Sequence, residues 1–267
     1  MIARREEFER FRNLAEERKL RRRLNYTYEQ VPETTCRRKA GCCFNCAEVY
    51  LAEYANIGNF VSRLPDEARG FILNQAVHYE LLSLVTLDYQ CPFLRDKDCL
   101  TYEVRPLQCR FYGLYPDQEY LELMADSRRS NAELGRMYAE KYGLRLPEEA
   151  LLYDVNQCPN NVDGSGKRAV VGSFERDRLF SQISSAQFDA FGDIDEEEIP
   201  IRSRFSLYLM MEHFTDDEQL RIKVATMKEY LRSGELPFLH EALKRMADRE
   251  GLSWEQVPAL RGLLAPA

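Results

Sequence analysis

All eight cysteines of this 267-residue chain lie between positions 36 and 158. Four of them stand within eleven residues in the pattern C-x5-CC-xx-C, and two of the others are followed directly by proline. A thiolate is a soft, strong ligand that suits zinc and iron–sulfur clusters, both of which typically take four protein ligands. The sequence therefore predicts that these thiols bind a metal or a cluster. The candidate ligands are Cys36, Cys42, Cys43, Cys46, Cys91, Cys99, Cys109 and Cys158.

Two of the candidate ligands, Cys42 and Cys43, are adjacent, which bears on the number of centres. In an extended backbone, successive side chains point to opposite sides, so this pair would reach two different centres more easily than one. A helical turn at the same place would splay the two thiols less. We therefore expect either two centres that share this block, or one cluster with one thiol of the pair outside the ligand set.

Zinc and iron–sulfur ligation differ in their typical spacing. A structural zinc site usually has paired C-xx-C steps, whereas this chain has a single step, from Cys43 to Cys46, and long gaps among the later cysteines. Cys91 and Cys158 are each followed by proline, as at the end of bacterial ferredoxin motifs. These features favour an iron–sulfur cluster, such as 4Fe-4S, and redox chemistry of the oxidoreductase type. Zinc is the alternative.

The composition is typical of a soluble globular protein, with 45% hydrophobic and 30% charged residues. No apolar run approaches the roughly 20 residues that span a bilayer, and the charged start does not resemble a secretory signal. We therefore expect a cytoplasmic protein, in which thiols stay reduced and structural disulfides are rare. The net charge of −7 disfavours a nucleic-acid partner and leaves a protein partner or protein substrate open.

The charge is uneven, because a basic segment lies near the start of the chain. This segment would suit an acidic partner, RNA or anionic lipid, but it is interpreted first as a solvated helix end. Further cations flank the cysteines and could offset the charge of a thiolate-bound centre. The basic residues are Arg18, Lys19, Arg21, Arg22, Arg23, Arg37, Arg38, Lys39 and Arg110.

The elements that must position the thiols are expected to be mainly α-helical. Apolar residues at helical spacing predict helices over about 3–24, from near Cys46 to Val61, from Pro65 to before Cys91, and over 119–142. The expected buried positions are Phe8, Phe11, Leu14, Tyr50, Tyr54, Ile57, Val61, Leu73, Val77, Leu81 and Leu84. Three histidines, His78, His213 and His240, are expected to be partly exposed on helices.

Between these helices, the polar stretch Arg95–Asp98 predicts a small hairpin that brings Cys91 and Cys99 near each other. A compact turn or short helix should follow up to Cys109, broken at Arg105-Pro106. Arg105 is expected to brace this loop through backbone hydrogen bonds. The stretch 160–166 is expected to be a loop.

Beyond about residue 170 the chain contains no cysteine and is expected to form a helical bundle. The overall expectation is an N-terminal charged helix (1–30), an irregular metal-organised cysteine region (31–168) and a C-terminal helical region (169–267). Three apolar stripes are expected in that last region. Their members are Leu207, Met210 and Phe214, then Leu220, Val224, Met227 and Leu231, then Leu239, Leu243 and Met246.

The chain resembles a bacterial cysteine-cluster family in three places. They are the Cys42-Cys43 pair, Cys91-Pro-Phe-Leu, and Cys99-Leu-Thr-Tyr-Glu-Val-Arg-Pro-Leu-Gln-Cys109-Arg-Phe-Tyr. That family comprises zinc- or iron-chelating domain proteins and includes flagellin lysine N-methylases. The resemblance covers about residues 36–158 and implies that the first seven cysteines are ligands; Cys158 matches only in its downstream position. The family opens with C-xx-C-xx-CC, whereas this chain has Cys36-x5-Cys42-Cys43.

Three functions fit these observations. The first is an iron–sulfur protein with redox or cluster-dependent chemistry, which the sequence favours. The second is a zinc-stabilised module that binds a protein partner, and the third is an enzyme similar to the lysine N-methylases. The chain has no G-x-S-x-G, H-E-x-x-H or G-x-G-x-x-G motif, so its sequence names no catalytic residue and leaves open whether it is an enzyme.

Overall fold

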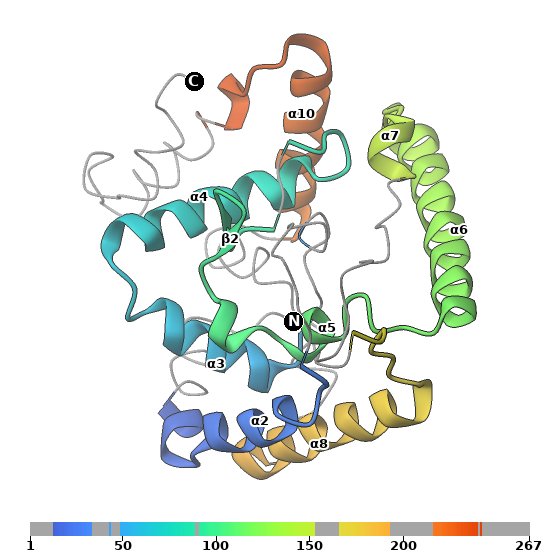
Figure 1. Cartoon of the computed structure of the whole chain (residues 1–267). Coiled ribbons are helices and arrows are strands. Elements are labelled where there is room, and N and C mark those ends of the chain that lie inside the picture. The colour runs from blue at the N-terminus through green and yellow to red at the C-terminus, as the bar shows by residue number, and fades with distance from the viewer. Residues whose placement is uncertain are drawn as a thin grey trace. The chain divides into compact units, whose positions relative to one another are not determined.

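The computed structural model describes residues 13–33, 43, 49–88, 91–152, 166–192, 216–239 and 241. These residues are mainly helical and contain one short antiparallel hairpin, which confirms the expected fold class at that level (Figure 1). The chain divides into two compact units. The first comprises Met1–Arg63, Leu94–Glu122 and Val155–Phe205, and the second comprises Leu64–Phe93, Leu123–Asp154 and Ser206–Ala267. The three successive domains expected from the sequence remain a prediction.

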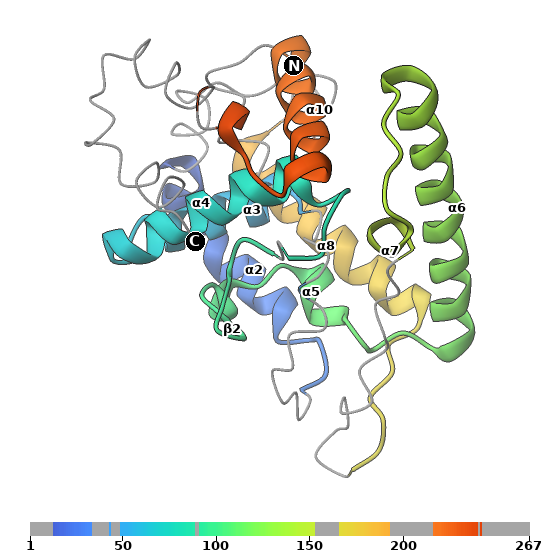
Figure 2. The same cartoon turned by 90° about the horizontal axis from the view of Figure 1, so that it is seen from above.

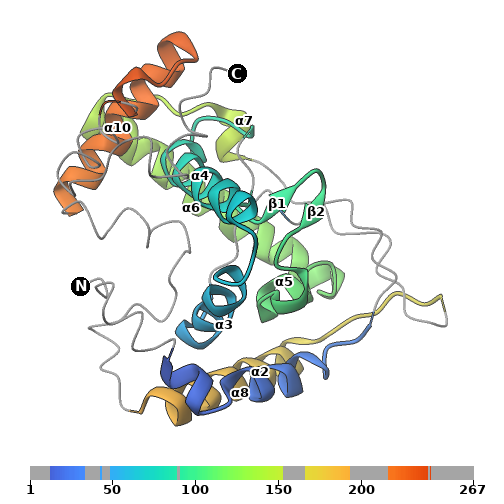
Figure 3. The same cartoon turned by 90° about the vertical axis from the view of Figure 1, so that its left-hand side faces the viewer.

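Three helices form the body of the first unit: α2 (Leu20–Tyr28), α3 (Leu51–Val61) and α8 (Ser173–Phe191). Helices α2 and α8 lie side by side, and α3 packs against both (Figures 1 and 3). Their apolar stripes bury one continuous core, the main source of stability for such a helical layer. Fully buried members of this core are Leu20, Leu24, Ala52, Ala55, Leu107, Phe111, Leu179 and Ile183.

The predicted helix over 3–24 is wrong at its C-terminal end. Residues 13–17 are helical, a turn follows, and α2 then begins at Leu20 and continues to Tyr28. The interruption lies at Lys19, which has a φ of 53°. This left-handed conformation is costly for a residue with a Cβ, so it breaks the helix there. Leu14 is half-buried, while Phe8 and Phe11 lie outside the described residues.

The predicted hairpin is confirmed. Strand β1 (Leu94–Arg95) pairs antiparallel with β2 (Asp98–Cys99), so that Leu94 lies opposite Cys99 and Arg95 opposite Asp98. The two turn residues Asp96 and Lys97 have φ values of 51° and 69°. Positive φ at both central residues defines the two-residue turn whose twist matches a β-hairpin.

The segment after the hairpin also follows the prediction. It forms the 3₁₀ helix η2 (Tyr102–Val104) and then the short helix α5 (Leu107–Phe111), with a break at Arg105-Pro106. Pro106 precedes the first helical residue, where its missing N–H is not needed and its fixed φ is suitable. The chain thus turns twice between Cys99 and Cys109.

The second unit contains α4 (Asp66–Leu82), α7 (Glu148–Leu151), α10 (Asp216–Ser233) and most of α6 (Asp117–Tyr142). Helix α10 packs on α4, and α7 lies against α6 (Figure 2). An ion pair at 2.9 Å joins Lys223 of α10 to Glu80 of α4. The core of this unit contains Val77, Leu81, Leu82, Tyr138, Leu144, Ile222, Met227 and Leu239.

The apolar stripes are confirmed in α3 and α4 wherever their side chains are described, although Tyr50 and Leu84 are only partly buried. In α10 the predicted stripe is partly wrong. Met227 is fully buried, but Leu231 is 40% exposed and Ile222 is buried instead. His78 is also buried rather than partly exposed, and its Nδ1 lies 3.0 Å from the carbonyl of Asn74.

Several predicted positions lie outside the described residues. They are His213, His240, Leu207, Met210, Phe214, Leu243, Met246 and the loop over 160–165, while the side chain of Leu73 is likewise not described. Within the described ranges, none of the helices combines the length and the apolar character needed to cross a bilayer.

Candidate metal centre

Four of the eight predicted ligands lie among the described residues. Cys43, Cys91, Cys99 and Cys109 are all half-buried thiols. Cys36, Cys42, Cys46 and Cys158 lie outside the described residues, as do Arg37, Arg38 and Lys39. Among the residues that are described, no group of three or more His, Cys, Asp or Glu side chains is placed to hold a metal. The complete ligand set therefore remains a prediction.

Cys91 lies three residues before β1, and the boundary between the two units falls between Phe93 and Leu94. Cys91 therefore belongs to the second unit, whereas Cys99 belongs to the first. The expected approach of these two thiols remains a prediction, while the hairpin itself is present.

Cys99 ends the hairpin, and its side chain contacts a buried residue of the turn that follows. Its Sγ lies 3.6 Å from Oγ1 of Thr101, a residue only 1% exposed. The Thr101 carbonyl accepts the N–H of Val104 at 3.0 Å, which closes η2. The position of this thiol is thus fixed by a buried residue two positions away.

Two arginines brace the backbone between Cys99 and Cys109. Arg105 donates from Nε to the carbonyl of Tyr102 at 3.3 Å, which confirms its predicted bracing role, and its guanidinium lies 3.6 Å from the Tyr102 ring centroid. Arg110 donates to the carbonyls of Arg105 at 2.9 Å and Glu103 at 3.0 Å. A planar guanidinium with several donors can satisfy such turn carbonyls together. Side-chain hydrogen bonds from the two arginines to backbone carbonyls therefore stabilise the loop internally.

The helix that carries Cys109 is anchored by a buried carboxylate on α3. Glu53 is 1% exposed, and its Oε1 accepts the N–H of Leu107 at 2.6 Å and the hydroxyl of Tyr28 at 3.0 Å. Leu107 is the first residue of α5, so its N–H has no acceptor within that helix. Glu53 thus caps α5, two residues before Cys109, and links it to α2 and α3.

The electrostatics of this anchor follow from its burial. Desolvation raises the pKa of Glu53, and the hydrogen bonds from Leu107, Tyr28 and Tyr50 oppose that increase. Burial, then the Glu53 carboxylate, raise the pKa of Tyr28 well above its usual value, so that its hydroxyl remains a donor. The Arg110 guanidinium lies 4.2 Å from the Tyr28 ring centroid, and burial lowers the pKa of Arg110. A cation, a phenol and a carboxylate therefore meet beside Cys109.

The sequence analysis did not identify Glu53 or Tyr28 as part of this region. A signal existed, because Glu53 is the one charged residue between positions 50 and 61, a mostly apolar stretch predicted to be helical. A lone carboxylate in such a stretch indicates a buried charge that needs partners. Its partners lie 25 and 54 residues away along the chain, so only the folded structure identifies them.

No family model, no curated protein and no solved structure shows a significant match to this chain. The interpretation of the site therefore depends on its residues and on the contacts described above.

Proposed function

We propose that this chain is an iron–sulfur protein of the cysteine-cluster type, with one or two centres that serve redox or cluster-dependent chemistry. The observation that carries the proposal is the segment from Cys99 to Cys109, whose two thiols are half-buried on a loop braced by arginines and anchored by Glu53. An exposed loop with dispensable thiols would not need such support. The two Cys-Pro steps favour an iron–sulfur cluster over zinc, and the adjacent Cys42-Cys43 pair is the reason for one or two centres.

The described thiols fit such a centre in their chemistry and in their exposure. Sulfur donors are the ligands that iron–sulfur clusters take from proteins, and half-buried thiols can be reached by incoming iron while remaining shielded from bulk water. Cys43, Cys91, Cys99 and Cys109 are the described residues that would hold the group, together with Cys36, Cys42, Cys46 and Cys158. When bound, the cluster would supply one-electron chemistry.

The chain's own residues have distinct roles in this proposal. The backbone bonds of Arg105 and Arg110 hold the loop, and the positive charge of Arg110 interacts electrostatically with Cys109. Thr101 and Glu53 fix the two ends of the loop, at Cys99 and Cys109 respectively. Such supporting contacts commonly tune the affinity of a metal site.

The test is to purify the full chain without oxygen and to measure iron, acid-labile sulfide and visible absorption. We expect a brown protein with equal amounts of iron and sulfide. Cys109→Ser should lower the iron content, whereas the matched variant Gln108→Ser, one residue away on the same helix, should retain it. Zinc in place of iron, in a colourless protein, would contradict the proposal and favour a zinc-stabilised binding module.

A further inference from the structure

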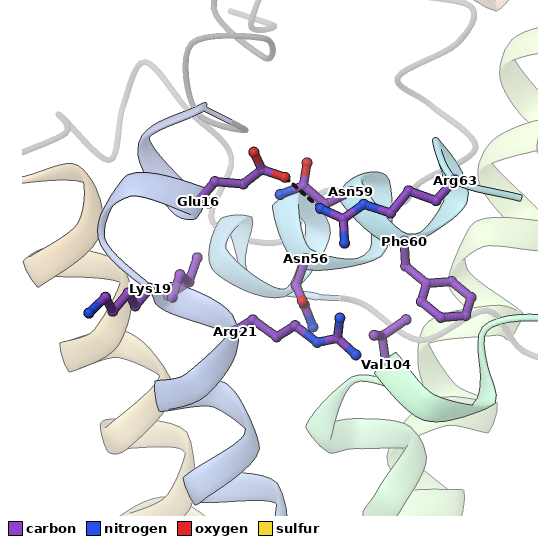
Figure 4. Close-up of a pocket in the computed structure, with 10 residues that line it drawn as sticks. Glu16, Lys19, Arg21, Asn56, Asn59, Phe60, Arg63 and Val104 are labelled. Carbon is purple, nitrogen blue, oxygen red and sulfur yellow. Dashed lines mark hydrogen bonds and ion pairs between the residues drawn. The ribbon is translucent and has the colours of Figure 1, made fainter.

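The first unit contains a cavity that the candidate metal centre does not use. It has a volume of about 340 Å³ and is lined by residues of α2, η2, α3 and the turn after α3, and of the helical stretch 13–17 with the turn that follows it (Figure 4). Volumes of this order are typical of sites for small organic ligands. Part of the lining is apolar and comprises Ala15, Leu20, Phe60 and Val104, of which the last two are neighbours in Figure 4.

A buried hydrogen-bond donor without an acceptor lines this cavity. Asn56 of α3 is 5% exposed, and its Nδ2 has no hydrogen-bond partner among the described residues. Leaving a buried amide donor unsatisfied costs on the order of 1–3 kcal/mol, so native proteins seldom keep one without a reason. In Figure 4 the Asn56 side chain extends from α3 toward the Arg21 side chain.

The charge around the cavity is positive. Arg63 is paired with Glu16 at 2.7 Å, whereas Arg21 forms no ion pair within the described part of the chain. Lys19 also lines the cavity, but its side chain is directed away from Asn56 in Figure 4. Within the part of the chain that the structure describes, the Arg21 guanidinium and the Asn56 amide therefore face each other with no acceptor for the Asn56 Nδ2, and an anion between them would supply one.

We propose that this cavity binds a small organic anion. Its carboxylate or phosphate group would accept hydrogen bonds from Arg21 and Asn56, and its apolar part would lie against Phe60 and Val104. The cation supplies attraction, the buried amide supplies direction, and the apolar part of the lining selects a ligand that is more than an inorganic ion. This proposal does not depend on which metal the cysteines bind.

The test is isothermal titration of the full chain with four probes: benzoate, phenyl phosphate, inorganic phosphate and neutral benzyl alcohol. We expect saturable binding of benzoate, phenyl phosphate or both, at least about tenfold tighter than that of benzyl alcohol and of inorganic phosphate. The stronger of the two organic probes identifies the head group. Absence of saturable binding by either would overturn the proposal, as would equal binding of benzyl alcohol. Either result would mean that the side-chain oxygen of Asn56 faces Arg21 and accepts a hydrogen bond from its guanidinium, so that no anion is needed.

Three variants separate binding from folding. Arg21→Gln should weaken the organic anion about tenfold, whereas Arg22→Gln, with the same charge change on the next residue and no part in the cavity wall, should leave the affinity unchanged. Asn56→Leu should also abolish binding, yet its Tm should be equal to or above that of the wild type, because an unsatisfied buried donor is removed. Unchanged affinity in Arg21→Gln or in Asn56→Leu would overturn the proposal, as would equal weakening by Arg22→Gln.

Discussion

Replacing Glu53 by alanine tests whether this carboxylate holds the first unit together. The substitution removes the acceptor of two buried donors, the Leu107 N–H at 2.6 Å and the Tyr28 hydroxyl at 3.0 Å. Each orphaned donor costs about 1–3 kcal/mol, so the loss is on the order of 2–6 kcal/mol. The ionised carboxylate is itself costly to bury, and its removal offsets part of that loss. We therefore expect a net loss of about 2–4 kcal/mol in unfolding free energy.

The assay is urea denaturation followed by circular dichroism at neutral pH. The control is Glu29→Ala, which replaces an exposed glutamate at the end of α2. It should change the unfolding free energy by at most about 0.5 kcal/mol. Glu53→Gln should lie between the control and Glu53→Ala. In Glu53→Gln, the side-chain carbonyl oxygen can still accept from Leu107 and Tyr28. The new NH₂ group, however, replaces the Oε2 that accepts the Tyr50 N–H in the wild type, so two donors face each other there. The reasoning is refuted if Glu53→Ala is as stable as the control.

Three further outcomes follow from described contacts. Because burial raises the pKa of Glu53 above its unfolded value of 4.5, protonation of Glu53 adds stability that is fully present below about pH 4.5 and is lost as the pH rises through the folded-state pKa. Urea titrations should therefore show the wild type gaining stability relative to Glu53→Gln as the pH falls from neutral towards 4.5. Lys223→Met removes the cation 2.9 Å from the nearly buried Glu80 and should lower the unfolding free energy by about 1–3 kcal/mol in the same titration, whereas Lys228→Met, on the exposed side of α10, should be close to neutral. Gly143→Ala should cost about 1 kcal/mol in thermal unfolding, because Gly143, directly after α6, has a φ of 61°; an unchanged Tm would contradict this.

Local features of the fold were predictable because local physics determines them. The stripe that includes Tyr54 and Ile57 required only the period of a helix, and both side chains are buried on α3 as predicted. The hairpin followed from a polar turn between apolar ends, and Asp96 and Lys97 adopt the left-handed conformation that such a turn requires. In the candidate site, the bracing role of Arg105 followed from its place beside a proline.

Features that depend on distant neighbours were not predictable. The break at Lys19 has no signal in the sequence, because lysine gives no indication of a left-handed backbone. On α10, whether Leu231 or Ile222 is buried depends on where α4 packs, and the apolar periodicity of α10 alone does not indicate that position. The roles of Glu53 and Tyr28 arise from three separate segments that meet only in the folded unit.

The capping of α5 by Glu53 has a consequence for experiments that use fragments. A synthetic peptide covering the hairpin through Phe111 would contain Cys99 and Cys109, but it would lack the carboxylate that receives the Leu107 N–H and the ring beneath Arg110. Its helix, only five residues long, is too short to persist alone in water. Metal affinities measured on such a peptide would therefore describe an unfolded chain, and a minimal transplantable version must also include α2 and α3.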